Sequence, residues 1–125
     1  MKNIFSIGLL MSSILTSSLA HADVPKVVSG NCQLQDSGEV ITLKNIDPFQ
    51  HFGMFAEGHS QEGFRVYLTM NIRNSVDLNI QTPNNSGFTA VELAKSGPTR
   101  VHTGISVTRA NGNEFEWLSC KLEVQ

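Results

Sequence analysis

Residues 64–80 read FRVYLTMNIRNSVDLNI, and this stretch decides the class of fold. Apolar and polar side chains alternate on both sides of a break at Arg73-Asn74-Ser75. A period of two places successive side chains on opposite faces of an extended chain, which predicts two half-buried strands and not a helix. A three-residue loop over the break keeps apolar residues opposite one another and pairs Met70 with Leu78. The stretch is therefore predicted to be a β-hairpin.

Two further hairpins follow from the same comparison of registers. Ser37-Gly38 and Asn111-Gly112 are two-residue turn signals, and Asn-Gly is the strongest short hairpin signal in the chain. Each turn keeps the apolar residues of its two strands on one face. The predicted pairs are Leu34 with Ile41 and Cys32 with Leu43 in the first hairpin, and Ile105 with Leu118, Val101 with Leu122 and Thr103 with Cys120 in the last, where Arg109 falls opposite Glu114.

The chain has two cysteines, Cys32 and Cys120, and the predicted registers turn both toward the apolar face of their hairpins. There is no Cys-x-x-Cys motif. An even number of cysteines in an exported chain favours a disulfide over a metal site or a redox motif. We predict one disulfide bond, between Cys32 and Cys120, that ties together the two ends of one core.

The first 22 residues have the features of a secretory signal peptide. Met1-Lys2-Asn3 is a short positive segment, residues 4–15 are mainly apolar, and Ala20-His21-Ala22 matches the small-x-small cleavage rule. A retained membrane anchor is the alternative, but Ser and Thr crowd the second half, which is too polar for a span of about 20 apolar residues. We predict cleavage after Ala22, a single exported domain over residues 23–125, no integral membrane span after processing, and a periplasmic or extracellular location.

Composition and charge narrow the class of protein further. The chain is 40% hydrophobic and 16% charged, which disfavours a disordered or collagen-like chain. Removing residues 1–22 takes away one of the nine Lys and Arg residues and none of the 11 Asp and Glu residues, which leaves a net charge of −3. A net negative domain lacks the basic footprint of a nucleic-acid-binding protein. We therefore predict no nucleic-acid partner.

Weaker strand patterns occupy the rest of the chain. Residues 89–93 alternate like a strand that leads through Ser96-Gly97-Pro98 to Val101, and residues 52–56 add a short strand. Seven or eight short strands, with no helix beyond the signal segment, predict an all-β fold. This fold is either an antiparallel β-sandwich or a small β-barrel built from hairpins.

Phe115 and Trp117 are misplaced apolar residues in the last hairpin. Alternation sets them on the face opposite Leu118 and Cys120. If that face meets solvent, the two rings form an exposed apolar patch, and such patches often mark partner or ligand sites. We predict a binding role for both. The alternative is that they pack over Gly104 or lie beneath a loop.

Residues 45–63 are predicted to be a long irregular segment, with no strand beyond the short one over residues 52–56. They hold half of the six phenylalanines that remain after processing: Phe49, Phe52 and Phe55. Long loops inside a compact domain are often functional, and loops are rarely this aromatic. We predict that these three rings bind a ligand or partner. The alternative is a satellite core that plugs one end of the sandwich or barrel.

No motif in the chain names a reaction. There is no Gly-x-Ser-x-Gly elbow, no His-Glu-x-x-His and no phosphate-binding glycine loop. Glu57, His59 and Glu62 are metal-ligand types close together in sequence, but they are also typical of a polar turn. We predict no enzymatic activity, no catalytic residue, no metal site and no cofactor.

The predicted function is an exported, non-enzymatic β-domain that binds a protein or an amphipathic ligand through the aromatic loop and face. One alternative is a small inhibitor that blocks an envelope or secreted hydrolase with residues 57–63. Another alternative is a structural envelope protein without catalytic activity. The identity of the ligand or partner and the oligomeric state do not follow from the sequence.

Overall fold

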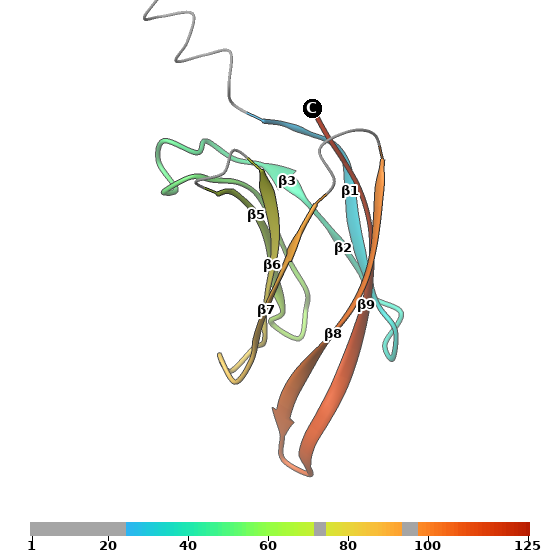
Figure 1. Ribbon diagram of the computed structural model, residues 1–125. Helices are drawn as coiled ribbons and strands as arrows, with labels where there is room; N and C mark the ends of the chain where they lie inside the picture. Colours follow the sequence, from blue (N-terminus) through green and yellow to red (C-terminus); the bar gives the residue numbers. More distant parts are fainter. Residues whose placement is uncertain (1–24, 72–74, 94–97) are drawn as a thin grey trace, which may run out of the picture.

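Two antiparallel sheets make up the part of the chain that the structure, a computed structural model, describes: residues 25–71, 75–93 and 98–125. Sheet A consists of β1 (Val27–Leu34), β2 (Val40–Thr42), β8 (Thr99–Arg109) and β9 (Gly112–Val124), in the order β2-β1-β9-β8. Sheet B consists of β3 (Lys44–Asn45), β4 (Met54–His59), β5 (Arg65–Met70), β6 (Val76–Gln81) and β7 (Phe88–Glu92), in that order. The sheets face each other as two layers in Figure 1. The predicted all-β class is confirmed, and the two layers fit a β-sandwich.

The hydrophobic core fills the space between the two sheets. Phe55 on β4 and Phe64 just before β5 are its largest side chains, and both are fully buried. Burial of each ring stabilises the fold by roughly 1.5 to 3 kcal/mol. Leu68 and Leu78 of sheet B and Leu118 of sheet A pack in the same cluster. The apolar faces predicted from the alternation are the faces that the structure buries.

The first and last strands of the domain are neighbours in sheet A. β1 pairs with β9 in antiparallel register, and Cys32 lies directly opposite Cys120. The two cysteines, 88 residues apart in sequence, form a disulfide bond, and both are buried in the core. The predicted disulfide is confirmed.

All three predicted hairpins form, but each register differs from the prediction by two residues. In the central hairpin Met70 pairs with Val76, and Leu78 pairs with Leu68. Five residues, 71–75, therefore separate the two strands, and the backbone N–H of Asn71 donates to the carbonyl of Ser75 at 2.9 Å. Part of the predicted three-residue loop, residues 73 and 74, lies outside the described residues.

The first hairpin has a four-residue loop in place of the predicted two-residue turn at Ser37-Gly38. Cys32 pairs with Ile41 and not with Leu43. The backbone N–H of Leu34 donates to the carbonyl of Glu39 at 2.9 Å, which closes the loop over residues 35–38. Gly38 has a φ of 73°, a left-handed conformation that glycine adopts without a steric cost.

The last hairpin turns one residue earlier than predicted. Arg109 pairs with Gly112, so the two-residue turn is Ala110-Asn111, and Thr103 pairs with Leu118 instead of Cys120. The predicted turn at Asn111-Gly112 requires a positive φ at both residues. Only Gly112 has one, at 115°. Gly112 therefore begins β9 and does not form the turn.

The long irregular segment predicted over residues 45–63 is wrong in part, because β4 occupies Met54–His59 and overlaps the short strand predicted over residues 52–56. A β-bulge between Met54 and Ala56 interrupts the pairing with β5 and turns both Phe55 and Ala56 inward. A bulge breaks the period of two, so the sequence pattern showed only part of this strand and placed its ends wrongly. With the short strand β3 the described residues form nine strands, compared with the seven or eight predicted.

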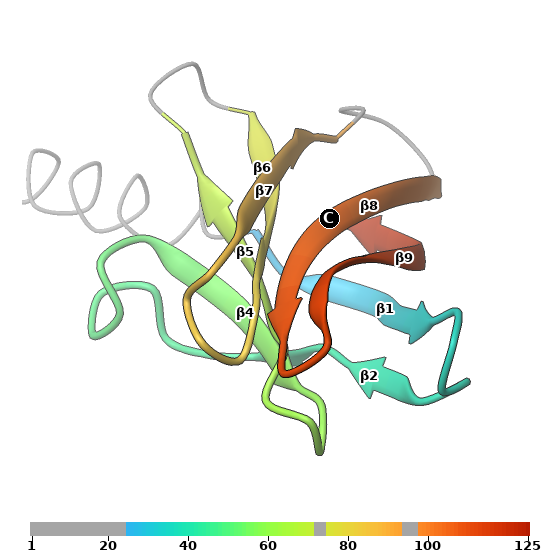
Figure 2. The same cartoon turned by 90° about the horizontal axis from the view of Figure 1, so that it is seen from below.

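Residues 89–93 form β7 as predicted, within one residue at each end. The predicted connection at Ser96-Gly97-Pro98 falls largely outside the described residues. Within the described residues there is no helix long and apolar enough to cross a membrane. Figures 1 and 2 place the turns after β1, β4, β6 and β8 at one end of the sandwich, and the loop between β3 and β4 at the other.

We expect loss of the disulfide to lower stability without changing the fold. A crosslink that closes a ring of this size stabilises mainly by restricting the unfolded chain, so the Cys32→Ser/Cys120→Ser double variant should lose about 2 to 5 kcal/mol of unfolding free energy. Urea denaturation of the oxidised wild type and the variant measures the difference. Equal denaturation midpoints would contradict this expectation.

Candidate binding surface

A row of three rings crosses the outer face of sheet A. Trp117 on β9 stacks on His102 of β8, with ring centroids 5.0 Å apart and an interplanar angle of 4°. Phe115, two residues before Trp117, has its ring centroid 5.2 Å from the Trp117 ring at an angle of 53°. We call these three residues the aromatic row. The prediction that Phe115 and Trp117 lie on the face opposite the core is confirmed, while their binding role stays a prediction.

Sequence reasoning missed His102, and the register explains why. The predicted register, which pairs Ile105 with Leu118, sets His102 opposite Lys121 and away from the tryptophan. In the structure His102 pairs with Ser119, which brings its ring diagonally next to Trp117. The Nδ1 atom of His102 lies 2.9 Å from the Ser119 hydroxyl oxygen, and this contact fixes the orientation of the ring. The sequence contained one signal for this contact, because alternation places His102 and Trp117 on the same outer face of the hairpin.

Gly104 on β8 lies directly beneath the Phe115 ring of the aromatic row. A Cβ atom at this position would overlap Cε1 of Phe115. The Phe115 ring therefore rests on the backbone of β8 because glycine has no side chain there. Even so, 54% of Phe115 and 42% of Trp117 stay exposed, so packing over Gly104 covers only part of the two rings.

Phe49 and Phe52 lie apart from this row, on the loop between β3 and β4. Hydrogen bonds within the loop hold it in shape: the Asp47 carboxylate accepts from the N–H of Phe49 at 3.0 Å, and the carbonyl of Pro48 accepts from the N–H of Gly53 at 3.0 Å. Phe52 is fully exposed and has a φ of 54°, which non-glycine residues rarely adopt. The loop thus displays both rings to solvent from an ordered backbone.

The structure does not bring the five predicted binding residues together. Phe115 and Trp117 lie on sheet A, and the loop with Phe49 and Phe52 lies beside sheet B at the opposite end of the sandwich (Figures 1 and 2). Phe55 is 1% exposed and belongs to the core, because the bulge in β4 turns it inward. The predicted binding site therefore combined residues from two separate surfaces with one core residue.

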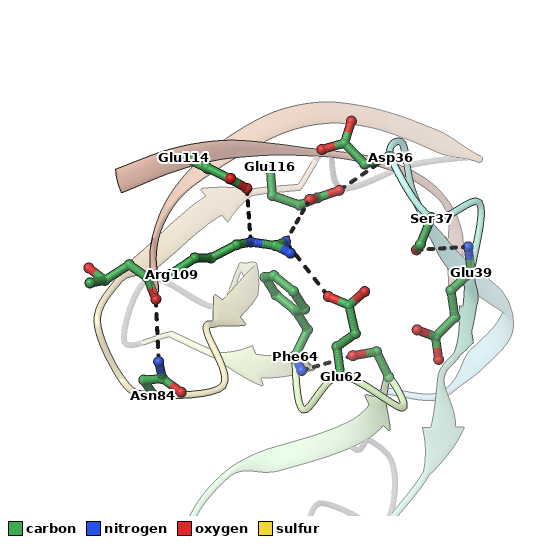
Figure 3. A network of polar contacts seen from close by, with 11 residues as sticks. Asp36, Ser37, Glu39, Glu62, Phe64, Asn84, Arg109, Glu114 and Glu116 are labelled. Carbon is green, nitrogen blue, oxygen red and sulfur yellow. Dashed lines mark hydrogen bonds and ion pairs between the residues drawn. The ribbon is translucent and has the colours of Figure 1, made fainter. Parts of the chain in front are cut away.

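A polar cluster closes the end of the sandwich near the β8–β9 turn. Figure 3 shows the Arg109 guanidinium among three carboxylates, at 3.1 Å from Glu114, 3.3 Å from Glu116 and 3.7 Å from Glu62. Glu116 also accepts a hydrogen bond from the N–H of Asp36 in the loop after β1. Partly exposed ion pairs of this kind contribute little each, from about 0 to 1 kcal/mol. Together with the hydrogen bond from Asp36, they connect two turns, the one after β1 and the one after β4, to the last hairpin.

Glu116 differs from the other carboxylates because its side chain is buried. Burial raises the pKa of Glu116 above the usual value of 4.5, since removal of water disfavours the charged form, and the nearby Asp36 carboxylate raises it as well. The N–H of Asp36 and the charge of Arg109 lower the pKa, but Arg109 is shared with Glu62 and Glu114. The increase in the pKa of Glu116 that burial causes is therefore larger than the decrease that the Arg109 guanidinium causes.

A hollow of about 290 Å³ lies beside Arg109, with Phe64 and Val107 among its apolar lining and Glu62 and Asn84 among its polar lining. Glu62 contacts Arg109, and the Asn84 amide donates to the carbonyl of Thr108 at 3.3 Å. These polar groups are already engaged with one another. We assign no ligand to this hollow.

The residues considered for metal binding make other contacts. Glu57 lies 3.2 Å from Arg65 and 3.6 Å from His59 on the outer face of sheet B, while Glu62 contacts Arg109 on the other side of the turn. Nowhere in the described ranges do three His, Cys, Asp or Glu side chains gather in a way that could hold a metal ion. The three residues are thus divided between two ion-pair networks.

Comparisons of the chain with known protein families, curated proteins and solved structures found no match. Function is therefore argued from the geometry of the surface.

We expect Gly104→Ala to displace Phe115 and to leave the fold intact. The new methyl group occupies the place of the ring, which can swing toward solvent because it is half exposed. Alanine loses less conformational entropy than glycine when a strand forms, and this gain offsets part of the lost packing of Phe115. The unfolding free energy should therefore change by less than about 1 kcal/mol. Trp117 is the single tryptophan and contacts Phe115, so its fluorescence should report the displacement. An unchanged emission spectrum would contradict the conclusion that the Phe115 ring rests on the backbone at Gly104.

We expect Glu116 to make the protein less stable as the pH rises above the usual glutamate pKa. With a raised pKa the folded state keeps a proton that the unfolded state releases, so the unfolding free energy falls between pH 4.5 and the raised value. Glu116→Gln should remove this slope, whereas Glu114→Gln, which changes a half-exposed partner of Arg109, should keep it. Urea midpoints from about pH 4 to about pH 8 test this. The same slope in wild type and Glu116→Gln would refute it.

Proposed function

We propose that this protein is an exported, non-enzymatic binding module and that the aromatic row on sheet A is its contact surface. One observation carries the proposal: Phe115, Trp117 and His102 stand next to one another and open to solvent on the face opposite the core. Exposed apolar patches mark binding sites more often than scattered single residues do. Tryptophan is also among the residues that contribute most to binding energy at interfaces.

The position of the row on paired strands supports a binding role. Trp117 is on β9, which pairs with β1 on one edge and with β8 on the other. Side chains on such a strand are held before a ligand arrives, so less conformational entropy is lost on binding. Rings next to the exposed hydroxyl of Ser119 fit an amphipathic ligand or a protein surface, because both offer apolar and hydrogen-bonding groups.

Export is the second part of the proposal. The positive, apolar and small-x-small segments of residues 1–22 support a cleaved signal peptide. The disulfide between Cys32 and Cys120 fits an oxidising compartment such as the periplasm or the extracellular space. A binding module in such a compartment meets envelope components, secreted proteins and polymers.

A small inhibitor of an envelope or secreted hydrolase is the second candidate function. The observation that favours it is the β3–β4 loop, which holds the fully exposed Phe52 at a positive φ. Unusual backbone conformations tend to occur at ligand and partner contacts. The turn over residues 60–64 is a poorer candidate, because Ser60 and Phe64 hydrogen-bond across it and Gln61 bonds to Glu39.

Alanine variants distinguish these functions. We expect the oxidised wild type to retain a partner from envelope extract or culture medium, and Trp117→Ala and Phe115→Ala to weaken that capture by about tenfold or more. Phe88→Ala is the matched control, because Phe88 has nearly the same exposure as Phe115, 55%, but lies on the edge strand of sheet B. Each variant is first checked for a wild-type denaturation midpoint.

The pattern of losses decides the outcome. Loss with Trp117→Ala and Phe115→Ala alone supports the aromatic row, and loss with Phe52→Ala alone supports the inhibitor. Equal capture by all variants, or no capture by any, would refute both candidates and favour a structural envelope protein.

A further inference from the structure

Two unpaired cations lie on the same outer face as the aromatic row. Arg100 on β8 and Lys121 on β9 are directly opposite each other, and both are exposed. Like charges at directly opposite positions destabilise an antiparallel pair. Neither cation has an ion-pair partner within the described ranges, whereas Arg65 and Arg109 each contact a carboxylate. Among the described residues, Arg100–Lys121 is therefore a like-charge cross-strand pair with no carboxylate at ion-pair distance.

The cations and the rings form one strip along β9. Phe115, Trp117, Ser119 and Lys121 are successive outward-facing residues of this strand. Outward residues two apart are about 7 Å apart, so the strip is about 20 Å long, with rings at one end and cations at the other. By alternation Glu123 is the next residue on this face beyond Lys121, and it marks the end of the cationic part. Gln33 of β1 is opposite Ser119 and exposed, which adds an amide to the middle of the strip.

From this arrangement we infer that the strip binds an acidic saccharide chain, an inference that rests on the proposed function and names its ligand class. The C–H groups of sugar rings pack on the negative faces of aromatic rings such as Phe115 and Trp117. The Ser119 hydroxyl contacts His102 and the Gln33 amide donates to the carbonyl of Gly38, and both side chains are exposed and keep further donor or acceptor positions for sugar hydroxyls. The carboxylates of an acidic saccharide neutralise Arg100 and Lys121, and arginine can bind a carboxylate through two parallel hydrogen bonds.

A saccharide fits this face better than an acidic peptide does. The strip is on the face of a sheet, where the backbone groups of β9 are already paired with β1 and β8. An extended peptide gains its main-chain hydrogen bonds at a strand edge, so a peptide on the face would lack them. A saccharide has no such backbone and binds through its ring faces, hydroxyls and carboxylates.

A dense polyanion such as a nucleic acid also fits poorly. Its binding depends on many phosphate contacts from Lys and Arg, whereas this face offers two adjacent cations on a chain of formal net charge −2. An acidic saccharide spaces its charges by whole sugar rings, which leaves ring faces free for Phe115 and Trp117. The combination of two cations and three rings favours a ligand that has both spaced negative charges and accessible sugar-ring faces.

The test compares three defined probes by titration of Trp117 fluorescence and by calorimetry. The probes are a short polygalacturonate, its methyl ester, which has the same sugar chain without the charge, and poly-L-glutamate, which has the charge without the sugar. We expect polygalacturonate to bind about tenfold or more tighter than either of the other probes, with an affinity that falls as salt rises.

Two variants and one control locate the contacts. Trp117→Ala should abolish binding of polygalacturonate and of its methyl ester, as followed by calorimetry. Arg100→Gln/Lys121→Gln should reduce binding of polygalacturonate to the level of the ester. Lys26→Gln/Lys44→Gln changes the net charge equally at exposed lysines outside the strip, and it should bind like wild type.

Each remaining outcome overturns the inference, and some leave the proposed function intact. Equal binding of polygalacturonate and its ester refutes charge selection, and equal binding of poly-L-glutamate refutes the saccharide. If no probe binds while capture of a partner still depends on Trp117, the ligand class is wrong and the binding module stands. If capture does not depend on Trp117 either, both fail.

Discussion

The pairing of β1 with β9 is the constraint on which the rest of the structure depends. It joins the first and last strands of the domain, and the buried disulfide between Cys32 and Cys120 fixes their register. β9 thereby becomes a strand with neighbours on both edges, and strands of this kind are among the last elements to open in a folded protein. Side chains on the outer face of β9 are thus presented from a strand that is paired on both edges.

Alternation in the sequence predicted which face of each strand is buried but not which residues are opposite. A shift of two residues conserves the face, so three registers were wrong while every apolar face was right. The exact register depends on how each loop closes. Asn71 and Ser75 close one loop, Gly38 allows another, and Gly112 begins a strand where a turn was expected. These hydrogen bonds and backbone conformations determine the register, and an alternation with a period of two carries no information about them.

The same limits explain what could be predicted of the candidate surface. Phe115 and Trp117 were found because they violate the alternation, and a parity argument is enough for that. His102 was missed because its contact with Trp117 depends on the register. Phe55 was assigned to a binding segment because the bulge in β4 breaks the alternation that would have marked it as a core residue. The contact between Arg109 and Glu114 survived the shift, because a long arginine side chain reaches a diagonal neighbour.

One strand therefore carries two different sets of side chains. The inward residues of β9 include Leu118, Cys120 and Leu122, which supply core packing and the disulfide. On the outward face the rings and Lys121 are unfavourable for an isolated domain, because they expose apolar area and set Lys121 beside Arg100. A fold tolerates such residues where its other face provides enough stability. Residues that break local rules and gather on one face are expected at a site under selection for binding.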